Sequence, residues 1–503
     1  MKNIFVNSFS GVFLLAIVIG FSSCQKDTIS PPNQSTAFVK YYGHVASQVA
    51  ADLLRTSDGG YILLGGTNSY TSGDEKDIFV VKTDSLGNEM WSSSFGKADV
   101  QSSSTSGFKG DYLKFDEVGV RLAELPDGSM YTLACNRTYV VYPNAASNVG
   151  TRGETKVVLY QIDAATGAPT TTDGVELHSE TADTLTESVA DMKLDSSSGV
   201  IKYVLTGYTT NVPTNKATIP GNDNAVSDRS DIFTVALDEN FNITWTSGNQ
   251  KYGRIGTDYG VSVQILPQGY LVCGTIERNY AGIGTGGTAT TYVPYSDMLA
   301  VFMDKVTGQP TNPNYYGEEG TNFLGGQSVY NPTTGRVTIL GYVEKEGGVA
   351  NSGKLAMVQI DEGGTAQSIN GSTLTYLDVN GAASDGSPFV SSSIAEIPDN
   401  EGYILSATYK ETSNEHDICI IKVDPTFTIA ANWPYYFGFN EVNGGGVFTT
   451  QETAGTVIPV TEAIAGTSQR KLTGYAFTGT FGLGTNDMLG LVKLNTNGDF
   501  KPE

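Results

Sequence analysis

Histidine and cysteine are both scarce in this chain, which has 3 histidines and 4 cysteines in 503 residues. The histidines form no His-x-x-His or H-E-x-x-H pattern, so a histidine-based metal site is not expected. Beyond the N-terminal segment, Cys135, Cys273 and Cys419 lie in strand-like runs, and an odd number cannot form a complete set of disulfides. We expect these three to be buried free thiols.

Positive charge is also in short supply. The chain carries 53 acidic and 30 basic residues, a net charge of −23. Such a field repels nucleic acid and anionic lipid, and no basic cluster offsets it. No G-x-S-x-G nucleophile motif occurs either. No nucleic-acid partner is expected, and the sequence assigns no catalytic residue.

Long apolar runs are missing, and the longest, from about Val12 to Phe21, is too short to span a bilayer, which needs about 20 residues. It is typical of an export signal, residues 1–23. The following "FSSC" resembles the lipobox of bacterial lipoproteins, with Phe21 where leucine is usual. The resemblance implies cleavage before Cys24 and its acylation, for example with palmitate. The alternative is that Cys24 is an ordinary residue of a plain signal peptide.

Residues 24–36 are polar and contain two prolines, so they are expected to form a flexible tether. The residue after Cys24 is Gln25, not the aspartate associated with retention at the inner membrane, which favours an outer-membrane location. Which side of that membrane the protein faces stays open.

Helical periodicity is absent after the signal, and short strand-like runs alternate with Gly-containing turns, which indicates an all-β protein. One unit, clearest at 47–96, recurs seven times. Its best marker is the third strand, which appears as "DIFVVKTD", "TKVVLYQID", "DIFTVALD", "DMLAVFMD", "GKLAMVQID", "DICIIKVD" and "DMLGLVKLN". The approximate units are 47–96, 112–180, 184–252, 257–317, 320–378, 386–438 and 445–503.

Four antiparallel strands repeated radially predict a β-propeller, here with seven blades over residues 37–503. The last unit has only three strands. Residues 37–43, "AFVKYYG", look like the fourth strand of other units, such as "WPYYFG". We therefore predict that this N-terminal strand completes the C-terminal blade and closes the ring, which removes both exposed sheet edges.

The pattern "DGGYIL…D-apolar-K-D…GN…W…FG" resembles the repeats of exported bacterial proteins, often lipoproteins of the Bacteroidota type. The resemblance implies the propeller fold and an exported location. It implies no single activity.

The connections between strands two and three are expected to be long in blades two to four, at 137–154, 209–230 and 276–296. Loops of this length in compact domains are often functional. We predict ligand contacts on this face from tyrosines in the loops; the alternative is that they are incidental residues of solvated loops. The candidates are Tyr139, Tyr142, Tyr280, Tyr292 and Tyr295.

Acidic residues raise a calcium hypothesis at "GNDNAVSDRSD", whose oxygen ligands would be Asp223, Asn224, Asp228 and Asp231. The alternative is a solvated acidic loop. The aspartates that begin the third strands are expected to cap their own turns. The three tryptophans are expected to open fourth strands and to pack between blades.

These features favour a binding, adhesion or scaffold lipoprotein at the outer membrane, with a polysaccharide or protein ligand. Two alternatives remain open. One is a propeller glycosidase or polysaccharide lyase that uses paired carboxylates. The other is a quinoprotein, because "IDAATG" and "MDKVTG" resemble turns of PQQ-type repeats.

Overall fold

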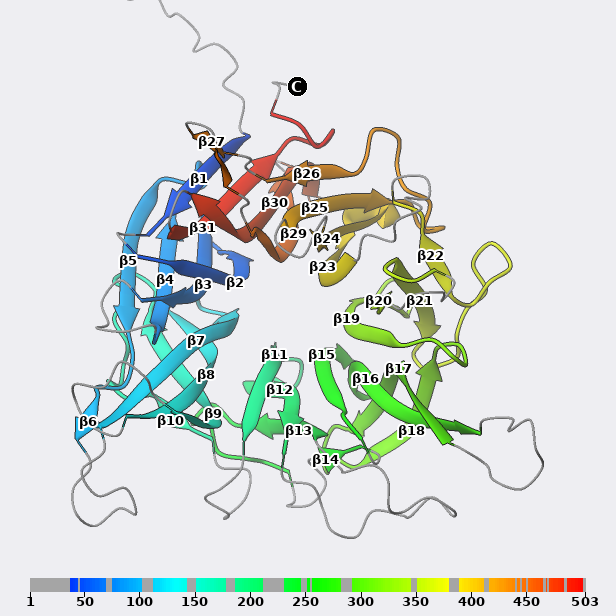
Figure 1. The fold of residues 1–503 in the computed structure, drawn as a ribbon, viewed down its shortest axis with the longest axis horizontal. Helices are drawn as coiled ribbons and strands as arrows, with labels where there is room; N and C mark the ends of the chain where they lie inside the picture. Colours follow the sequence, from blue (N-terminus) through cyan, green and yellow to red (C-terminus); the bar gives the residue numbers. More distant parts are fainter. Residues whose placement is uncertain are drawn as a thin grey trace, which may run out of the picture.

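The protein is a ring of seven four-stranded antiparallel sheets, which confirms the predicted seven-bladed β-propeller (Figure 1). A computed structural model describes residues 37–43, 46–68, 75–101, 112–142, 151–177, 186–210, 230–245, 251–253, 256–281, 292–344, 351–379, 389–410, 416–438, 441–443, 446–448, 451–464, 467, 470–483 and 486–500. Within these residues, no helix has the length and apolar character needed to cross a membrane.

Each blade runs outward from the first strand, which lies nearest the centre of the ring (Figure 1). Blade 1 contains β2 (Gln48–Arg55), β3 (Tyr61–Thr67), β4 (Asp77–Thr83) and β5 (Glu89–Phe95). Blade 2 contains β7 (Tyr112–Glu124), β8 (Met130–Tyr142), β9 (Thr151–Asp163) and β10 (Val175–Glu176), with β6 (Val100–Gln101) beside β7. Blade 3 contains β11 (Glu187–Asp195), β12 (Lys202–Thr209), β13 (Asp231–Leu237) and β14 (Lys251–Tyr252).

The second half of the ring repeats this arrangement. Blade 4 contains β15 (Tyr259–Leu266), β16 (Gly269–Ala281), β17 (Tyr292–Asp304) and β18 (Pro310–Tyr316). Blade 5 contains β19 (Phe323–Asn331), β20 (Arg336–Val343), β21 (Leu355–Asp361) and β22 (Thr375–Leu377). Blade 6 contains β23 (Phe389–Ile397), β24 (Gly402–Lys410), β25 (His416–Val423) and β26 (Tyr435–Phe437), with the 3-10 turn η1 (Pro398–Asn400) after β23. A separate hairpin, β27 (Glu441–Asn443) and β28 (Gly446–Phe448), precedes blade 7.

Blade 7 closes the ring as predicted. It contains β29 (Thr453–Ala463), β30 (Arg470–Leu483), β31 (Asn486–Leu494) and, as its fourth strand, β1 (Phe38–Tyr42). β1 pairs antiparallel with β31, from Phe38 opposite Lys493 to Tyr42 opposite Leu489. The two ends of the described chain thus meet in one sheet, at the top of Figure 1.

The core is divided into seven apolar clusters, one between each pair of neighbouring blades. Because both faces of a blade are covered, the second and third strands are buried along almost their whole length, as in β3 and β4. This explains their continuous apolar sequence. Cys135, Cys273 and Cys419 lie in this core as free thiols, as predicted, and burial raises the pKa of each.

A register shift interrupts the first strand of every blade, for example between Ala50 and Asp52 in β2. The residue after the shift bonds to the next blade: Asp52 accepts the Leu122 N–H at 2.8 Å, and Asp191 accepts the Val263 N–H at 2.9 Å. A bulge re-aims a side chain in this way. The inner ring is therefore tied blade to blade.

Candidate functional site

The two faces of the ring differ in their connections. The links between strands one and two and between strands three and four lie on one face, here called the turn face. The links between strands two and three and between blades lie on the other, here called the loop face. On the turn face, the residue at the end of each third strand caps the turn into the fourth strand. Its side chain accepts hydrogen bonds from the N–H groups of that turn. These residues are Asp84, Asp163, Asp238, Asp304, Asp361, Asp424 and Asn495.

The links that precede the third strands fall largely outside the described residues, so capping by the aspartates at the start of these strands stays a prediction. These aspartates lie at the loop face, against the next blade. A Cβ built on Gly96 would lie 2.5 Å from Asp77 Oδ1 and 2.6 Å from Glu117 Oε2 of blade 2. The same joint recurs where Asp231 and Asp258 meet at Gly253.

The first of these joints contains a carboxyl group with a raised pKa. Arg137 Nε donates to Glu117 Oε1 at 2.8 Å, and both side chains are only 1% exposed. Burial, and then repulsion from Glu117 and Asp99, raises the pKa of Asp77 to about 6. A carboxyl group with a raised pKa is a common feature of active sites. Here the recurrence of the joint at Asp231 and Asp258 assigns it to blade packing.

The predicted ligand-binding tyrosines lie in strands and not in loops, which is a correction. Tyr139 and Tyr142 belong to β8, Tyr280 to β16, and Tyr292 and Tyr295 to β17. The strands extend because their aromatic and β-branched residues continue the pairing, as in Arg278 opposite Tyr295. The Tyr139 hydroxyl donates to Glu176 Oε2 at 2.9 Å, and its ring packs 5.3 Å from that of Phe115. The side chains of Tyr142, Tyr280 and Tyr292 lie outside the described part.

The calcium hypothesis falls mostly outside the described residues, since only Asp231 of its four members is described. Asp231 is 1% exposed at the blade 3–4 joint. Within the described ranges, no group of three or more His, Cys, Asp or Glu side chains is arranged to hold a metal ion.

The tryptophans pack between blades as predicted, although only Trp91 lies in its fourth strand. The indole N–H of Trp91 donates to the carbonyl of Ala164 in blade 2, and that of Trp245 donates to the carbonyl of Lys305 in blade 4. Trp245 and Trp433 lie before β14 and β26. The turns "IDAATG" and "MDKVTG" provide the glycines, Gly167 and Gly308, against which these rings lie. The likeness to PQQ-type repeats therefore has a packing explanation.

Trp433 is half-buried and lines an open cavity. Two cavities of about 620 and 690 Å³ lie on the turn face over blades 6 and 7. They share the lining residues Lys422, Thr496 and Asn497 and so form one depression, here called the blade 6–7 groove. Trp433 and Tyr435 line one part, and Asp399, Glu401 and Arg470 line the other.

Aromatic and hydrogen-bonding groups adjoin in the groove. The half-buried rings of Trp433 and Tyr435 meet edge to face with centres 5.0 Å apart. The Tyr435 hydroxyl donates to the carbonyl of Asn497 at 3.2 Å, which fixes this ring against blade 7. Trp433 also packs edge to face on Tyr475 of blade 7, with centres 5.7 Å apart.

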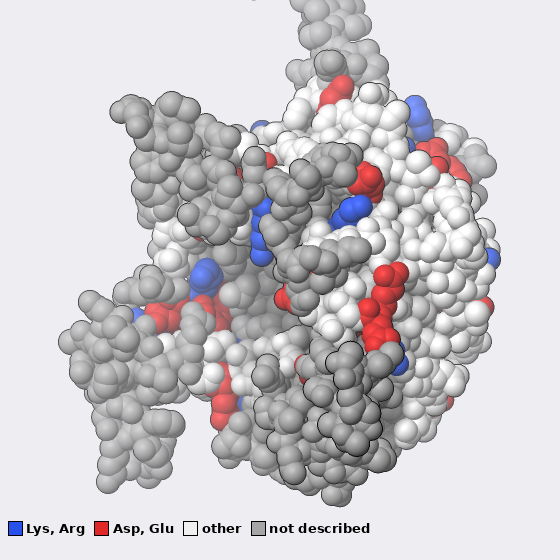
Figure 2. Space-filling model, turned by 45° about the vertical axis from the view of Figure 1, so that its right-hand side comes forward, with Lys and Arg blue, Asp and Glu red and all other residues white. Residues whose placement is uncertain are grey.

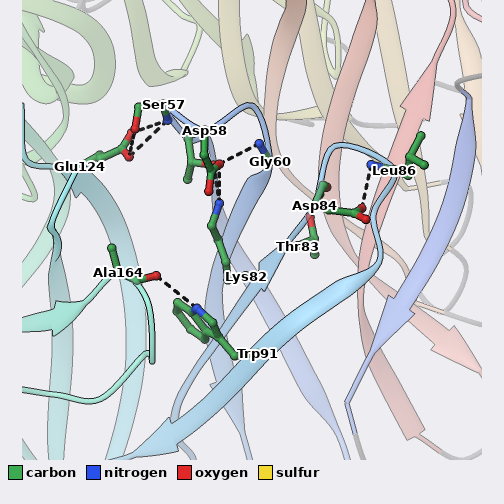
Figure 3. A network of polar contacts seen from close by, with 11 residues as sticks. Ser57, Asp58, Gly60, Lys82, Thr83, Asp84, Leu86, Trp91, Glu124 and Ala164 are labelled. Carbon is green, nitrogen blue, oxygen red and sulfur yellow. Dashed lines mark hydrogen bonds and ion pairs between the residues drawn. The ribbon is translucent and has the colours of Figure 1, made fainter. Parts of the chain in front are cut away.

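The lysine of the groove is held more loosely than its counterpart in blade 1. Figure 3 shows Lys82 pointing at Asp58, and these groups are 2.8 Å apart with Lys82 2% exposed. Lys422 occupies the same position in the repeat of blade 6, but its Nζ lies 3.7 Å from Glu401 Oε2 and its side chain is 19% exposed. Lys422 can therefore reach a ligand in the groove. The sequence reasoning missed this site, although the "NWPYYF" segment was available as a signal.

Comparisons with known proteins give only distant likenesses. No family model matches the chain, and no curated protein matches it. Among solved structures, the subtype N10 neuraminidase-like protein of a little yellow-shouldered bat isolate from Guatemala is 12% identical with a TM-score of 0.39, over 77% of this chain and 98% of that one. An α-L-arabinofuranosidase from Fusarium graminearum is 8% identical with a TM-score of 0.39, over 76% and 93%. The polysaccharide lyase Uly1 is 9% identical with a TM-score of 0.38, over 90% and 91%. Because these likenesses are weak, the assignment of this chain to the seven-bladed β-propellers rests on its own seven sheets.

Proposed function

We propose that this protein binds a carbohydrate in the blade 6–7 groove. The observation that carries the proposal is the pair of half-buried rings, Trp433 and Tyr435, next to the amide of Asn497 and the ammonium group of Lys422. Sugars present apolar C–H faces and hydroxyl groups, and a site for them needs both rigid amphipathic rings and a few fixed polar groups. Each of the two cavities of the groove has the size of a small-molecule site, for which roughly 300–1,000 Å³ is typical.

The groove carries charged side chains of both signs: Lys422, Arg470 and Lys471 on one hand, and Asp399, Glu401 and Asp499 on the other. Figure 2 shows a similar mixture on one side of the ring, where basic and acidic groups lie singly among uncharged residues. Recognition there depends on hydrogen bonds and ring contacts more than on a field of one sign. This proposal moves the ligand from the loop face, where the sequence placed it, to the turn face.

Glycan cleavage is a second candidate function, and one observation favours it. Asp399 and Glu401 line the same cavity from a single turn. Two carboxyl groups flanking a sugar are the usual requirement for glycoside hydrolysis. If the protein is an enzyme, Glu401→Gln abolishes product release from a glycan panel while the oligosaccharide still binds; a binding protein releases no product in either form.

Calorimetric titration of purified protein with neutral oligosaccharides tests the proposal. Tyr435→Ala should weaken binding about tenfold, which corresponds to ~1.4 kcal/mol. Tyr436→Ala is the matched control, because it removes the neighbouring exposed ring, which packs on Tyr409 of its own blade instead of lining the groove. Equal losses from both substitutions, or binding that neither changes, would remove the groove as the site.

We also propose that the mature protein is exported and anchored in the outer membrane through acylated Cys24. The lipobox-like "FSSC" and the polar segment 24–36 support this proposal, and both lie outside the described residues. More than one acyl chain gives stable anchoring. Metabolic labelling with palmitate should mark the wild-type protein and not Cys24→Ala. Equal labelling of both would refute the anchor.

A further inference from the structure

A smaller cavity of about 400 Å³ lies on the turn face between blades 5 and 6. Its walls come from the strand one–two turns of both blades and from both strand three–four links. The lining includes Arg336, Gln359, Asn370, Asn400, Tyr403 and Thr426. The polar groups of the cavity are therefore amides, hydroxyls and a guanidinium group, and Ile369 and Pro425 add apolar surface.

The charge of this lining is unusual for so acidic a protein. Arg336 is the one ionised side chain among the residues that line the cavity, in a chain of net charge −23. Three of the other described arginines are paired with acids, namely Arg121 with Asp191, Arg137 with Glu117, and Arg278 with Asp297, whereas Arg470 bonds to Thr461. Arg336, half-buried, has no such ion pair among the described residues.

The nearest acid along the sheet is already engaged. Asp361 lies opposite Arg336 in the pairing of β20 with β21. Its Oδ1 accepts the N–H groups of Gly363 and Thr365, both at 2.9 Å, and its Oδ2 accepts from Gln367 at 3.3 Å. This carboxylate serves its own turn, so the guanidinium is left to face the cavity.

The other walls are held in place before any ligand arrives. Gln359 donates to the Tyr403 hydroxyl at 3.1 Å, and Asn370 donates to the carbonyl of Thr426 at 3.2 Å. These bonds join blade 5 to blade 6 across the cavity. A site with fixed walls loses less conformational entropy on binding.

We propose that this cavity binds the carboxylate of an acidic sugar, with Arg336 as the anion-binding residue. The guanidinium group matches a carboxylate with two parallel hydrogen bonds, and the surrounding amides and hydroxyls suit the sugar's own hydroxyls. The inference rests on the proposed function and narrows it. The turn of blade 6 that carries η1 separates the two sites: Asn400 lines the cavity, and Asp399 and Glu401 line the blade 6–7 groove. A glycan chain crossing this turn would contact both, so the ligand class is an acidic polysaccharide.

The test compares oligogalacturonate with its methyl ester, which keeps the sugar rings and removes the charge. Calorimetry should show at least tenfold tighter binding of the acid to the wild type. Arg336→Gln should remove that preference and leave the ester unchanged, and Arg336→Lys should keep part of it. Lys193→Gln, which removes one positive charge from blade 3, should change neither, and thermal unfolding of each variant checks the fold.

The outcomes separate this inference from the proposed function. If acid and ester bind equally and Tyr435→Ala still weakens both, the groove stands and the carboxylate site is wrong. If the acid alone binds, through Arg336 and without any effect of Tyr435→Ala, the carboxylate site stands and the groove does not. If neither oligomer nor free galacturonate binds, the carboxylate site is overturned; if the neutral oligosaccharides do not bind either, the groove is overturned as well.

Discussion

The indole N–H of Trp91 in blade 1 donates a hydrogen bond to the carbonyl of Ala164 in blade 2, 3.2 Å away. The ring of Trp91 also lies on Gly167, where an added Cβ would be 2.5 Å from the ring. Phe38 occupies the matching position of blade 7, four residues before an aromatic–glycine pair, and lies on Gly87 of blade 1 in the same way. The same kind of contact thus joins blade 1 to blade 2 and blade 7 to blade 1.

Gly167→Ala should destabilise the protein by more than its backbone strain alone. Gly167 has φ 72°, and the new methyl group would displace the Trp91 ring. Gly199→Ala is the matched control, because Gly199 has φ 75° and nothing within 4 Å of the added Cβ. We expect Gly167→Ala to cost about 1–3 kcal/mol more in urea unfolding, as overpacking does. Equal losses would show that the Trp91 contact contributes nothing.

Tyr42→Phe tests the closure of the ring. The Tyr42 hydroxyl donates to the carbonyl of Gly87 at 2.8 Å, and the side chain is buried between blades 7 and 1. Its loss should lower the free energy of unfolding by about 1 kcal/mol. Hydrogen exchange should also quicken in β1 and β31 before other strands. If it quickens uniformly around the ring, the joint between blades 7 and 1 is no weaker than the rest.

Stability should depend on pH through Asp77. Its pKa in the folded protein, about 6, lies above its ordinary value of 3.8 because of burial and the neighbouring acids. The folded state therefore binds more protons than the unfolded state between about pH 4 and 6, and stability falls as the pH rises through this window. Asp77→Asn should be more stable than the wild type above pH 6, with the difference vanishing below pH 4.

Asp84→Asn should show the opposite sign. Although slight burial opposes the shift, hydrogen bonds from Asn88 and from turn N–H groups lower the pKa of Asp84. Its contribution is present above the ordinary pKa and is lost as the pH falls. The substitution should therefore destabilise the protein at neutral pH and matter less in acid. Unfolding curves from pH 4 to 8 check both variants; parallel pH profiles would contradict the assigned roles.

Removing one partner of the Arg137–Glu117 pair should be costly. Both side chains are 1% exposed, so Arg137→Met leaves a buried carboxylate without its cation. Breaking such a pair typically costs about 3–5 kcal/mol, whereas replacing both partners costs much less. The double variant Glu117→Gln/Arg137→Met should recover part of the loss in a denaturation cycle. Additive losses would mean that the two groups do not interact.

Much of the fold is readable from sequence because its rules are local and repeated. The third-strand pattern "DIFVVKTD" recurs in every blade because both faces of that strand are buried. The closing strand at residues 37–43 can be predicted because the last repeat unit contains only three strands. The strand-one bulges have no comparable sequence marker, since residues as different as Gly119 and Ser391 precede them.

The candidate site was harder to predict because it depends on distant residues. Lys422, Arg470 and Asn497 come from three segments that meet only when blade 7 packs on blade 6. Trp433 looked like a third copy of Trp91, and its packing against Tyr475 agrees with that role. That Trp433 also lines the blade 6–7 groove follows only from the packing of blade 7 on blade 6. The position of Arg336 in the wall of a cavity without an acidic side chain likewise depends on how blades 5 and 6 pack, which no sequence pattern shows.

The fluorescence of Trp433 tests the carbohydrate proposal most directly. In a Trp91→Phe/Trp245→Phe variant, Trp433 is the only remaining indole, because the chain has 3 tryptophans. Titration with an oligosaccharide that calorimetry shows to bind should shift its emission with the same dissociation constant. Binding that leaves the emission of Trp433 unchanged would place the ligand elsewhere and contradict the account.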